Sequence, residues 1–118
     1  MSDTKDIQTR NDTVFVNNYL RYPVVITKGE GCVLYGADDR KYLDFLSGIA
    51  VCALGHCHPK VTEAICKQAG KLVHVSNLYY TEPQTELAEM LVANSFGDKI
   101  FMCNSGAEAN EFLIKLAR

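Results

Sequence analysis

The residues best suited to bind a ligand lie near the end of the sequence, in residues 104–111 (NSGAEANE). Ser105 and Glu108 form an S-x-x-E capping box, which predicts that a helix begins at Gly106 or Ala107. Gly106 carries no Cβ, so a ligand can approach the backbone closely there. The amides of Gly106 and Ala107 are expected to point out of the positive end of the helix dipole. This pattern predicts an anion site suited to a phosphate group.

The capping box also has an interpretation without a ligand, because such boxes are common at helix starts and most of them bind nothing. The apolar run 99–103 just before the box favours the phosphate site, since α/β proteins bind ligands beyond the carboxyl ends of their strands. Spacing alone leaves both interpretations open. Further along the predicted helix, Glu111 and Lys115 are spaced i, i+4 and should form an ion pair on the solvent face.

A second group of reactive side chains combines two histidines with three cysteines: His56, His58, Cys52, Cys57 and Cys66. Their spacing contains neither C-x-x-C nor H-x-x-x-H, which are paired patterns that metal sites use. A nucleophilic pair of Cys57 with a neighbouring histidine lacks a third group to orient it. We therefore predict no metal site and no catalytic residue here. The segment is instead predicted to be a turn in which His58 caps the helix that Pro59 opens.

The elements that must position these residues follow from hydrophobic patterns and turn residues. Three short β-type runs with glycine-containing turns between them predict an antiparallel meander: 24–28, 32–35 and 41–45. Proline starts two predicted helices, at Pro59 and Pro83, because its fixed φ suits the first turn. The apolar run 99–103 predicts a strand buried on both faces, and 105–118 predicts a final helix. The polar residues 1–13 predict a mobile lead-in.

Composition excludes several classes of function. The chain has 118 residues, 47% of them hydrophobic, and a formal net charge of −2, so it is not a disordered polyelectrolyte. It has no cluster of Lys and Arg for a nucleic-acid surface, and its longest nearly apolar run, 48–55, is too short to cross a membrane. The polar N-terminus without an apolar stretch predicts a cytoplasmic location. Five cysteines, an odd number, predict free and mostly buried thiols.

Several motifs carry a resemblance to one family. Residues 104–111, continuing into 115–118 (KLAR), resemble the phosphate-binding segment of class III pyridoxal-phosphate aminotransferases. Four upstream motifs are similar to that family in the same order: KYLDF at 41–45, GIAV at 48–51, LGHCHP at 54–59 and HVSNLY at 74–79. The resemblance extends from about Tyr19 to Arg118. Several ordered motifs together are a more specific signal than any one of them alone.

The resemblance implies an α/β fold of fold type I that is incomplete in this chain. Residues 1–75, with the meander and helices, are then the N-terminal segment of the small domain. Residues 76–118 begin the large parallel-sheet domain, which binds pyridoxal 5'-phosphate. The resemblance assigns the cofactor phosphate to the main-chain amides of Gly106 and Ala107, with Ser105 beside them.

The resemblance also assigns two residues to the substrate. Tyr19 lies where the family places an aromatic residue near the substrate, and Ile49 lies where ornithine-using members carry a tyrosine that reads the free α-amino acid end. An isoleucine there favours the acetylornithine branch, whose members transfer an amino group between N-acetylornithine and 2-oxoglutarate in arginine biosynthesis. The family also implies a homodimer. From the residues alone, ordinary packing is the simpler explanation of both side chains.

Chemistry with this cofactor needs a lysine for the internal Schiff base and an acidic partner for the pyridine nitrogen. None of the eight lysines matches the family's lysine motif, and its aspartate and substrate-binding arginine are expected beyond Arg118. The chain is therefore expected to be an N-terminal portion without a catalytic residue, whose last two helices expose apolar faces. Two other interpretations stay open. One is a class III member of the ornithine, succinylornithine or 4-aminobutyrate type, and the other is a short non-catalytic phosphate-binding or interaction module.

Overall fold

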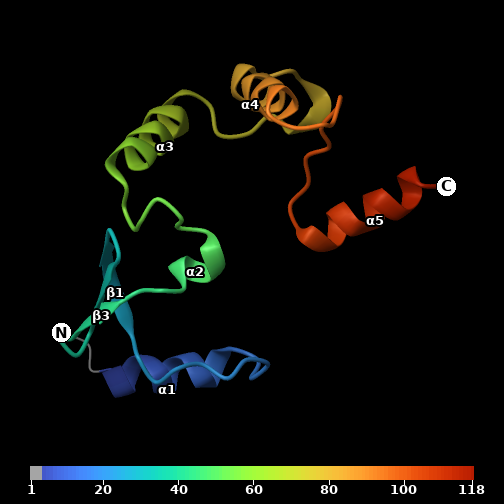
Figure 1. Ribbon diagram of the computed structural model, residues 1–118. Helices are drawn as coiled ribbons and strands as arrows, with labels where there is room; N and C mark the ends of the chain where they lie inside the picture. The colour runs from blue at the N-terminus through green and yellow to red at the C-terminus, as the bar shows by residue number, and fades with distance from the viewer. Residues whose placement is uncertain (1–3) are drawn as a thin grey trace. The chain divides into compact units, whose positions relative to one another are not determined.

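The computed structural model describes residues 4–118, which divide between Val73 and His74 into two units (Figure 1). The first unit contains α1 (Thr4–Val14), β1 (Ile26–Glu30), β2 (Val33–Gly36), β3 (Lys41–Leu43), α2 (Ser47–Ala50) and α3 (Pro59–Lys71). The second unit contains a 3-10 turn, η1 (Ser76–Leu78), and the helices α4 (Glu82–Ala93) and α5 (Gly106–Leu116).

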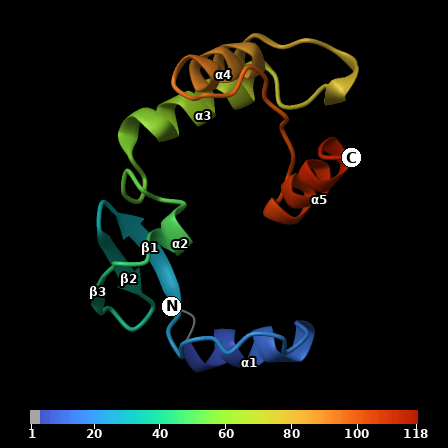
Figure 2. The same ribbon diagram turned by 45° about the vertical axis from the view of Figure 1, so that its right-hand side comes forward.

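The three strands form the predicted antiparallel meander, in the order β1-β2-β3 (Figure 2). Glu30 pairs with Val33 across the first turn. The second turn is closed by the Asp38 carboxylate, which accepts hydrogen bonds from the Arg40 N–H at 3.2 Å and from the Tyr42 hydroxyl at 2.9 Å. β1 begins two residues later than the sequence predicts, at residue 26 instead of 24.

Residues 44–58 fold back onto the turn between β1 and β2. Gly31 and His56 exchange two main-chain hydrogen bonds, from Gly31 N–H to His56 O at 3.0 Å and from His56 N–H to Gly31 O at 2.8 Å. A Cβ on Gly55, whose φ is 92°, would lie 3.1 Å from Gly31 Cα. A Cβ on Gly29 would lie 2.7 Å from Cγ of His56. The close approach of the two segments therefore requires glycine at both positions.

The segment α2 is a left-handed turn, unlike the other helices. Ser47, Gly48, Ile49 and Ala50 all have a positive φ, between 49° and 64°. Ile49, at φ 60° and ψ 56°, occupies a region that β-branched residues rarely adopt and that costs about 1–3 kcal/mol per residue. Such a conformation persists only where the surrounding structure imposes it.

The helices that proline is predicted to open are both present. Pro59 is the first residue of α3, and Pro83 lies in the first turn of α4. His58 occupies the N-cap position of α3 as expected, but its side chain makes no capping hydrogen bond. α5 begins at Gly106, as the capping box predicts, and its Glu111–Lys115 ion pair forms at 2.9 Å.

Residues 4–13 of the predicted mobile lead-in lie in the helix α1, and residues 1–3 of that prediction lie outside the described residues. An ion pair between Asp6 and Arg10, 3.2 Å long, spans one turn of α1. The hydroxyls of Thr9 and Thr13 donate to carbonyls four residues earlier, at 2.9 and 2.8 Å. α1 has no buried residue, and these polar contacts between neighbouring turns stabilise it.

The predicted strand at 99–103 is wrong. No strand forms there, and Phe101 is 51% exposed instead of buried on both faces. A strand needs a neighbour with which to share ladder hydrogen bonds, and among the described residues the only sheet is the meander of the first unit. Phe101 instead stacks on Phe112 of α5, with ring centroids 3.8 Å apart and an interplanar angle of 7°.

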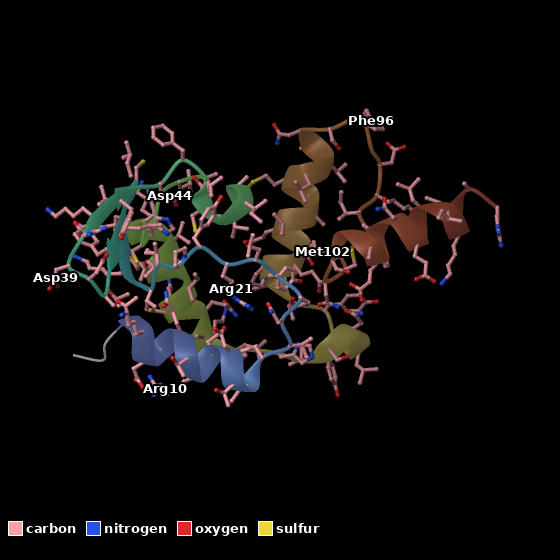
Figure 3. All side chains as sticks on the ribbon, turned by 90° about the horizontal axis from the view of Figure 1, so that it is seen from below. Arg10, Arg21, Asp39, Asp44, Phe96 and Met102 are labelled. Carbon is pink, nitrogen blue, oxygen red and sulfur yellow. The ribbon has the colours of Figure 1, made fainter. Side chains whose placement is uncertain are left out.

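Many apolar side chains within residues 4–118 are exposed, and no hydrophobic residue there is fully buried. On the last two helices Met90 is 63% and Leu113 is 62% exposed, as the resemblance led us to expect. Phe96, in the loop after α4, is fully exposed (Figure 3). The five cysteines are free, as predicted, but four are exposed and Cys52 is only half-buried, so the expectation of mostly buried thiols is wrong. No helix in the described part of the chain is long and apolar enough to span a membrane.

Candidate functional site

The N-terminus of α5 has the geometry that the capping box predicts. Ser105 is the N-cap residue, with an extended backbone, and its Oγ accepts a hydrogen bond from the Glu108 N–H at 3.3 Å. In return, Glu108 Oε2 accepts from the Ser105 hydroxyl at 3.3 Å and from the Asn104 N–H at 2.7 Å. These reciprocal bonds satisfy donors that a helix end otherwise leaves unpaired, and they fix the point where α5 begins.

The first two N–H groups of α5 have no acceptor among the described residues. Gly106 and Ala107 donate no hydrogen bond within residues 4–118, and both residues are exposed. A Cβ built on Gly106 would meet no atom within 4 Å, so the space beside its backbone is open. Adjacent free amides at the positive end of a helix dipole can bind an anionic group such as phosphate.

The carboxylate of Glu108 lies beside the same helix end. The hydrogen bond from the Asn104 N–H is the main cause that lowers the pKa of Glu108, and the Ser105 hydroxyl adds to it. The carboxylate therefore stays ionised and occupies the donors of Asn104 and Ser105. In this arrangement Ser105 acts as the cap, and the amides of Gly106 and Ala107 are the donors left for a ligand.

Tyr19, the first predicted substrate residue, belongs to the first unit. It lines a hollow of about 390 Å³ formed by residues of α1 and of the segment that follows. The side chain of Tyr19 is 68% exposed. The guanidinium carbon of Arg21, a residue labelled in Figure 3, lies 5.8 Å from the ring centroids of both Tyr19 and Phe15. An aromatic face beside a cation can contact a charged small molecule such as an amino acid.

Ile49, the second predicted substrate residue, lies in the left-handed turn α2. It is 91% exposed, and it is not among the residues that line the hollow beside Tyr19. The structure therefore does not bring Tyr19 and Ile49 into one hollow. The predicted phosphate-binding residues, 105–107, belong to the second unit.

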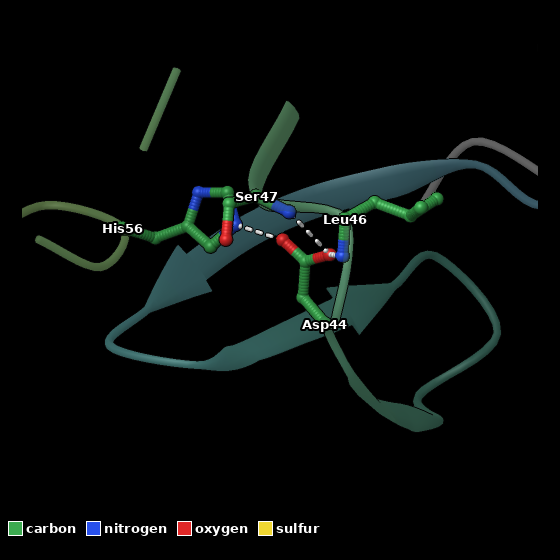
Figure 4. Close-up of polar contacts among 4 residues, drawn as sticks. All are labelled: Asp44, Leu46, Ser47 and His56. Atoms are coloured by element: carbon green, nitrogen blue, oxygen red, sulfur yellow. Dashed lines mark hydrogen bonds and ion pairs between the residues drawn. The ribbon is translucent and has the colours of Figure 1, made fainter. Parts of the chain in front are cut away.

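A hydrogen-bonded pair that sequence reasoning missed joins Asp44, which follows β3, to His56 (Figure 4). Asp44 Oδ2 lies 2.6 Å from His56 Nε2, and the two side chains are 7% and 19% exposed, respectively. Asp44 Oδ1 also accepts from the N–H groups of Leu46 and Ser47, at 2.8 and 3.0 Å. The hydrogen bond with His56 is the main cause that lowers the pKa of Asp44, and the two main-chain donors add to it.

Only half of this pair has a local signal in the sequence. An aspartate that bonds to main-chain N–H groups two and three residues later is a common way to begin a turn, and Asp44 precedes Ser47 and Gly48 in this manner. Its partner His56 comes twelve residues later, and no regular spacing in the sequence indicates that the two residues pair. Among residues 4–118 no group of three or more His, Cys, Asp or Glu side chains is arranged to hold a metal ion.

Comparison with known proteins identifies the family. The aminotransferase class-III family model matches residues 14–118. This chain belongs to the class III aminotransferases. It is 57% identical over 103 residues to the acetylornithine aminotransferase of Caldanaerobacter subterraneus, and the match covers 87% of this chain and 26% of that relative. The chain thus spans about a quarter of the length of this class III relative.

Solved class III structures share the fold. The acetylornithine aminotransferase of Elizabethkingia anophelis matches 99% of this chain and 30% of its own, with a TM-score of 0.93 and 34% identity. The ornithine delta-aminotransferase of Plasmodium falciparum matches 98% of this chain and 30% of its own, with a TM-score of 0.91 and 35% identity. The structure therefore matches an N-terminal part of the fold-type I aminotransferases. Because enzymes named for two substrates match almost equally, the fold does not distinguish the substrate.

Class III membership implies dependence on pyridoxal phosphate. Two observations at the N-terminus of α5 fit the phosphate of that cofactor. The amides of Gly106 and Ala107 have no acceptor among the described residues, and the space where Gly106 lacks a Cβ is open. The donor set is therefore of the kind that binds phosphate through the main chain.

Proposed function

We propose that this chain is the N-terminal quarter of an acetylornithine aminotransferase, a cytoplasmic homodimer that uses pyridoxal 5'-phosphate. The enzyme moves an amino group between N-acetylornithine and 2-oxoglutarate in arginine biosynthesis. Residues 1–75 begin its small domain, and residues 76–118 begin its large cofactor domain. The proposal depends on the free amides of Gly106 and Ala107, in a chain that is 57% identical to a relative named acetylornithine aminotransferase.

Three residues at the start of α5 have distinct roles in this proposal. The N–H groups of Gly106 and Ala107 bind the cofactor phosphate, and Ser105 holds the helix end in place through its bonds to Glu108. When bound, the cofactor supplies the electron sink that amino transfer needs. In this proposal the lysine that holds the cofactor lies outside residues 1–118, because none of the eight lysines of this chain matches the family's lysine motif.

Tyr19 and Ile49 contact the amino donor in this proposal. The side chain of Ile49 is exposed and apolar, so it suits the uncharged acetylated nitrogen of N-acetylornithine. Free ornithine carries an ammonium group at that nitrogen, and an apolar neighbour leaves the ammonium without a hydrogen-bond partner. The Arg21 guanidinium lies 5.8 Å from the ring centroid of Tyr19. Together the two side chains offer an aromatic and a cationic surface to the same amino donor.

Amino transfer by the full-length enzyme tests the proposal. With 2-oxoglutarate as acceptor, kcat/KM should be higher for N-acetylornithine than for ornithine, succinylornithine or 4-aminobutyrate. Higher kcat/KM for one of the other donors would keep the enzyme in class III but contradict the acetylornithine branch. If no donor supports transfer while pyridoxal phosphate still binds, a non-catalytic phosphate-binding module would be the better description.

A further inference from the structure

One loop of the first unit is fixed at both ends by residues to which the proposed function gives no role. Its first residue, Asp44, donates its N–H to Cys32 O, in the turn before β2, at 2.9 Å. Its last residue, His56, exchanges two main-chain hydrogen bonds with Gly31. The side chains of Asp44 and His56 then join each other at 2.6 Å (Figure 4). Residues 44–56 therefore form a loop whose ends are tied both to the sheet and to each other.

This loop contains the left-handed turn α2. Asp44 Oδ1 accepts from the N–H groups of Leu46 and Ser47, so the carboxylate reaches the first residue of the turn. Ile49, two residues further on, is 91% exposed, so its side chain packs against little else within residues 4–118. Its positive φ and those of its neighbours therefore depend on the hydrogen bonds of the loop.

We propose that the pair of Asp44 and His56, here called the Asp44–His56 clamp, positions Ile49 and thereby sets the choice of amino donor. This inference rests on the proposed function, in which Ile49 faces the acetylated nitrogen. The clamp itself touches no substrate. It keeps residues 47–50 in the left-handed conformation, which presents an apolar side chain at one defined place. Without the clamp the turn relaxes toward the right-handed region that L-residues prefer, and Ile49 moves.

Two replacements of Asp44 in the full-length enzyme test the clamp. Asp44→Ala removes the three side-chain hydrogen bonds of that carboxylate and should lower kcat/KM for N-acetylornithine on the order of 10- to 100-fold, mainly through KM, because a misplacement of about 1 Å can cost that much. The preference for N-acetylornithine over ornithine should fall with it. Asp44→Asn keeps a side-chain oxygen that can accept from Leu46 and Ser47, together with an amide group that can still hydrogen-bond to His56, so it should retain most of the preference.

Asp38→Ala is the matched control. Asp38 also closes a turn of the same sheet, and its carboxylate accepts from the Arg40 N–H and from the Tyr42 hydroxyl. Neither of these bonds involves residues 44–56, so this variant should loosen the turn between β2 and β3 without changing the donor preference. Equal changes of donor preference in Asp44→Ala and Asp38→Ala would overturn the clamp, because they would indicate a general loss of structure.

Amide hydrogen exchange adds a measurement that needs no turnover. The Leu46 and Ser47 amides should exchange slowly in the unmodified enzyme, and Asp44→Ala should accelerate both of them. Unchanged exchange would overturn the clamp. An active enzyme whose donor preference survives Asp44→Ala would overturn the clamp alone. An unmodified enzyme that transfers no amino group would instead overturn the proposed function, and the role of the clamp in selectivity with it.

Discussion

The left-handed turn α2 and the N-terminus of α5 present their residues by opposite means. The turn at 47–50 adopts a costly conformation and is held by a carboxylate and a histidine that lie twelve residues apart. The N-terminus of α5 adopts a favoured conformation and is held by Ser105 and Glu108, three residues apart. The first depends on contacts between distant segments, whereas the second depends on near neighbours alone.

Because of this difference, we expect the two regions to respond differently to substitution. A segment held by distant contacts loses its conformation when any one of those contacts is removed, so substitutions around 44–56 should act first on structure. A helix end held by its own residues keeps its conformation more easily. Substitutions at Gly106 and Ala107 should therefore act mainly on the ligand, through the space and the donors that the helix end offers.

The largest structural effect is expected for Gly55→Ala. Gly55 has a φ of 92°, and an added Cβ would lie 3.1 Å from Gly31 Cα. Backbone strain and the displaced pairing of Gly31 with His56 should together lower the local opening free energy of this loop by roughly 2–4 kcal/mol. Amide hydrogen exchange of Gly31 and His56, whose N–H groups form that pairing, measures the loss as a local opening free energy in the full-length enzyme.

Gly31→Ala is the control for this prediction. Gly31 also has a positive φ, 55°, but a Cβ there would meet no atom within 4 Å. Only the conformational cost of a left-handed residue should remain, about 1–2 kcal/mol. If the two substitutions cost the same, the close approach of Gly55 to Gly31 contributes nothing, and the loop is less dependent on distant contacts than we infer.

The second prediction concerns ligand binding at α5. Gly106→Ala should weaken the binding of pyridoxal phosphate about tenfold, which corresponds to about 1.4 kcal/mol, because the added methyl enters the open space beside the two free amides. The helix itself should be slightly stabilised, since alanine has a higher helix propensity than glycine. Titration of the full-length enzyme with pyridoxal phosphate, followed by absorbance, gives the Kd.

Gly70→Ala, in α3, is its matched control. Gly70 is also a helical glycine beside which a Cβ would meet nothing within 4 Å, so this variant has the same gain in helix propensity. Its affinity for pyridoxal phosphate should not change. An unchanged Kd in Gly106→Ala would contradict the assignment of the phosphate to this helix end.

The contrast between the two regions also explains what the sequence could predict. The capping box at Ser105, the proline-initiated helices at Pro59 and Pro83 and the meander were all predicted, because each signal lies within a few residues of the structure that it specifies. The residues of the candidate phosphate site were found for the same reason. Whether they bind phosphate stays a prediction.

The features that sequence reasoning missed depend on partners elsewhere in the chain or on none at all. The Asp44–His56 clamp joins residues twelve positions apart, and no periodicity marks such a pair. Residues 99–103 have the apolar pattern of a buried strand, but the pattern cannot supply the neighbouring strand that a sheet requires. α1 was missed because it has no apolar stripe, the main signal for a helix in sequence.

A third prediction concerns the cap itself. Ser105→Ala removes the acceptor for the Glu108 N–H and should cost about 1 kcal/mol of local stability, measured by exchange of that amide in the full-length enzyme. The affinity for pyridoxal phosphate should change less than in Gly106→Ala, because the free amides of Gly106 and Ala107 remain. A larger loss of affinity in Ser105→Ala would mean that the serine hydroxyl itself binds the phosphate.

The smallest effects should come from acid titration of the two carboxylates. The pKa values of Asp44 and Glu108 both lie below their ordinary values, chiefly because of the hydrogen bonds from His56 and from the Asn104 N–H, respectively. A carboxyl group whose pKa is lowered by folding stabilises the folded state above its ordinary pKa, near pH 4. That contribution should be lost as the pH falls through the lowered pKa, and it should be fully present at neutral pH.

Two substitutions distinguish the carboxylates by the origin of their shifts. His56→Ala should raise the pKa of Asp44 toward its ordinary value, because the bond with His56 is the largest cause of the shift. Ser105→Ala should leave the pKa of Glu108 low, because the main-chain donor of Asn104 is its largest cause and remains in place. Carboxyl NMR titration of the full-length enzyme measures both. Equal shifts would mean that Glu108 depends on a side-chain partner as much as Asp44 does, and the distinction between the two regions would then fail.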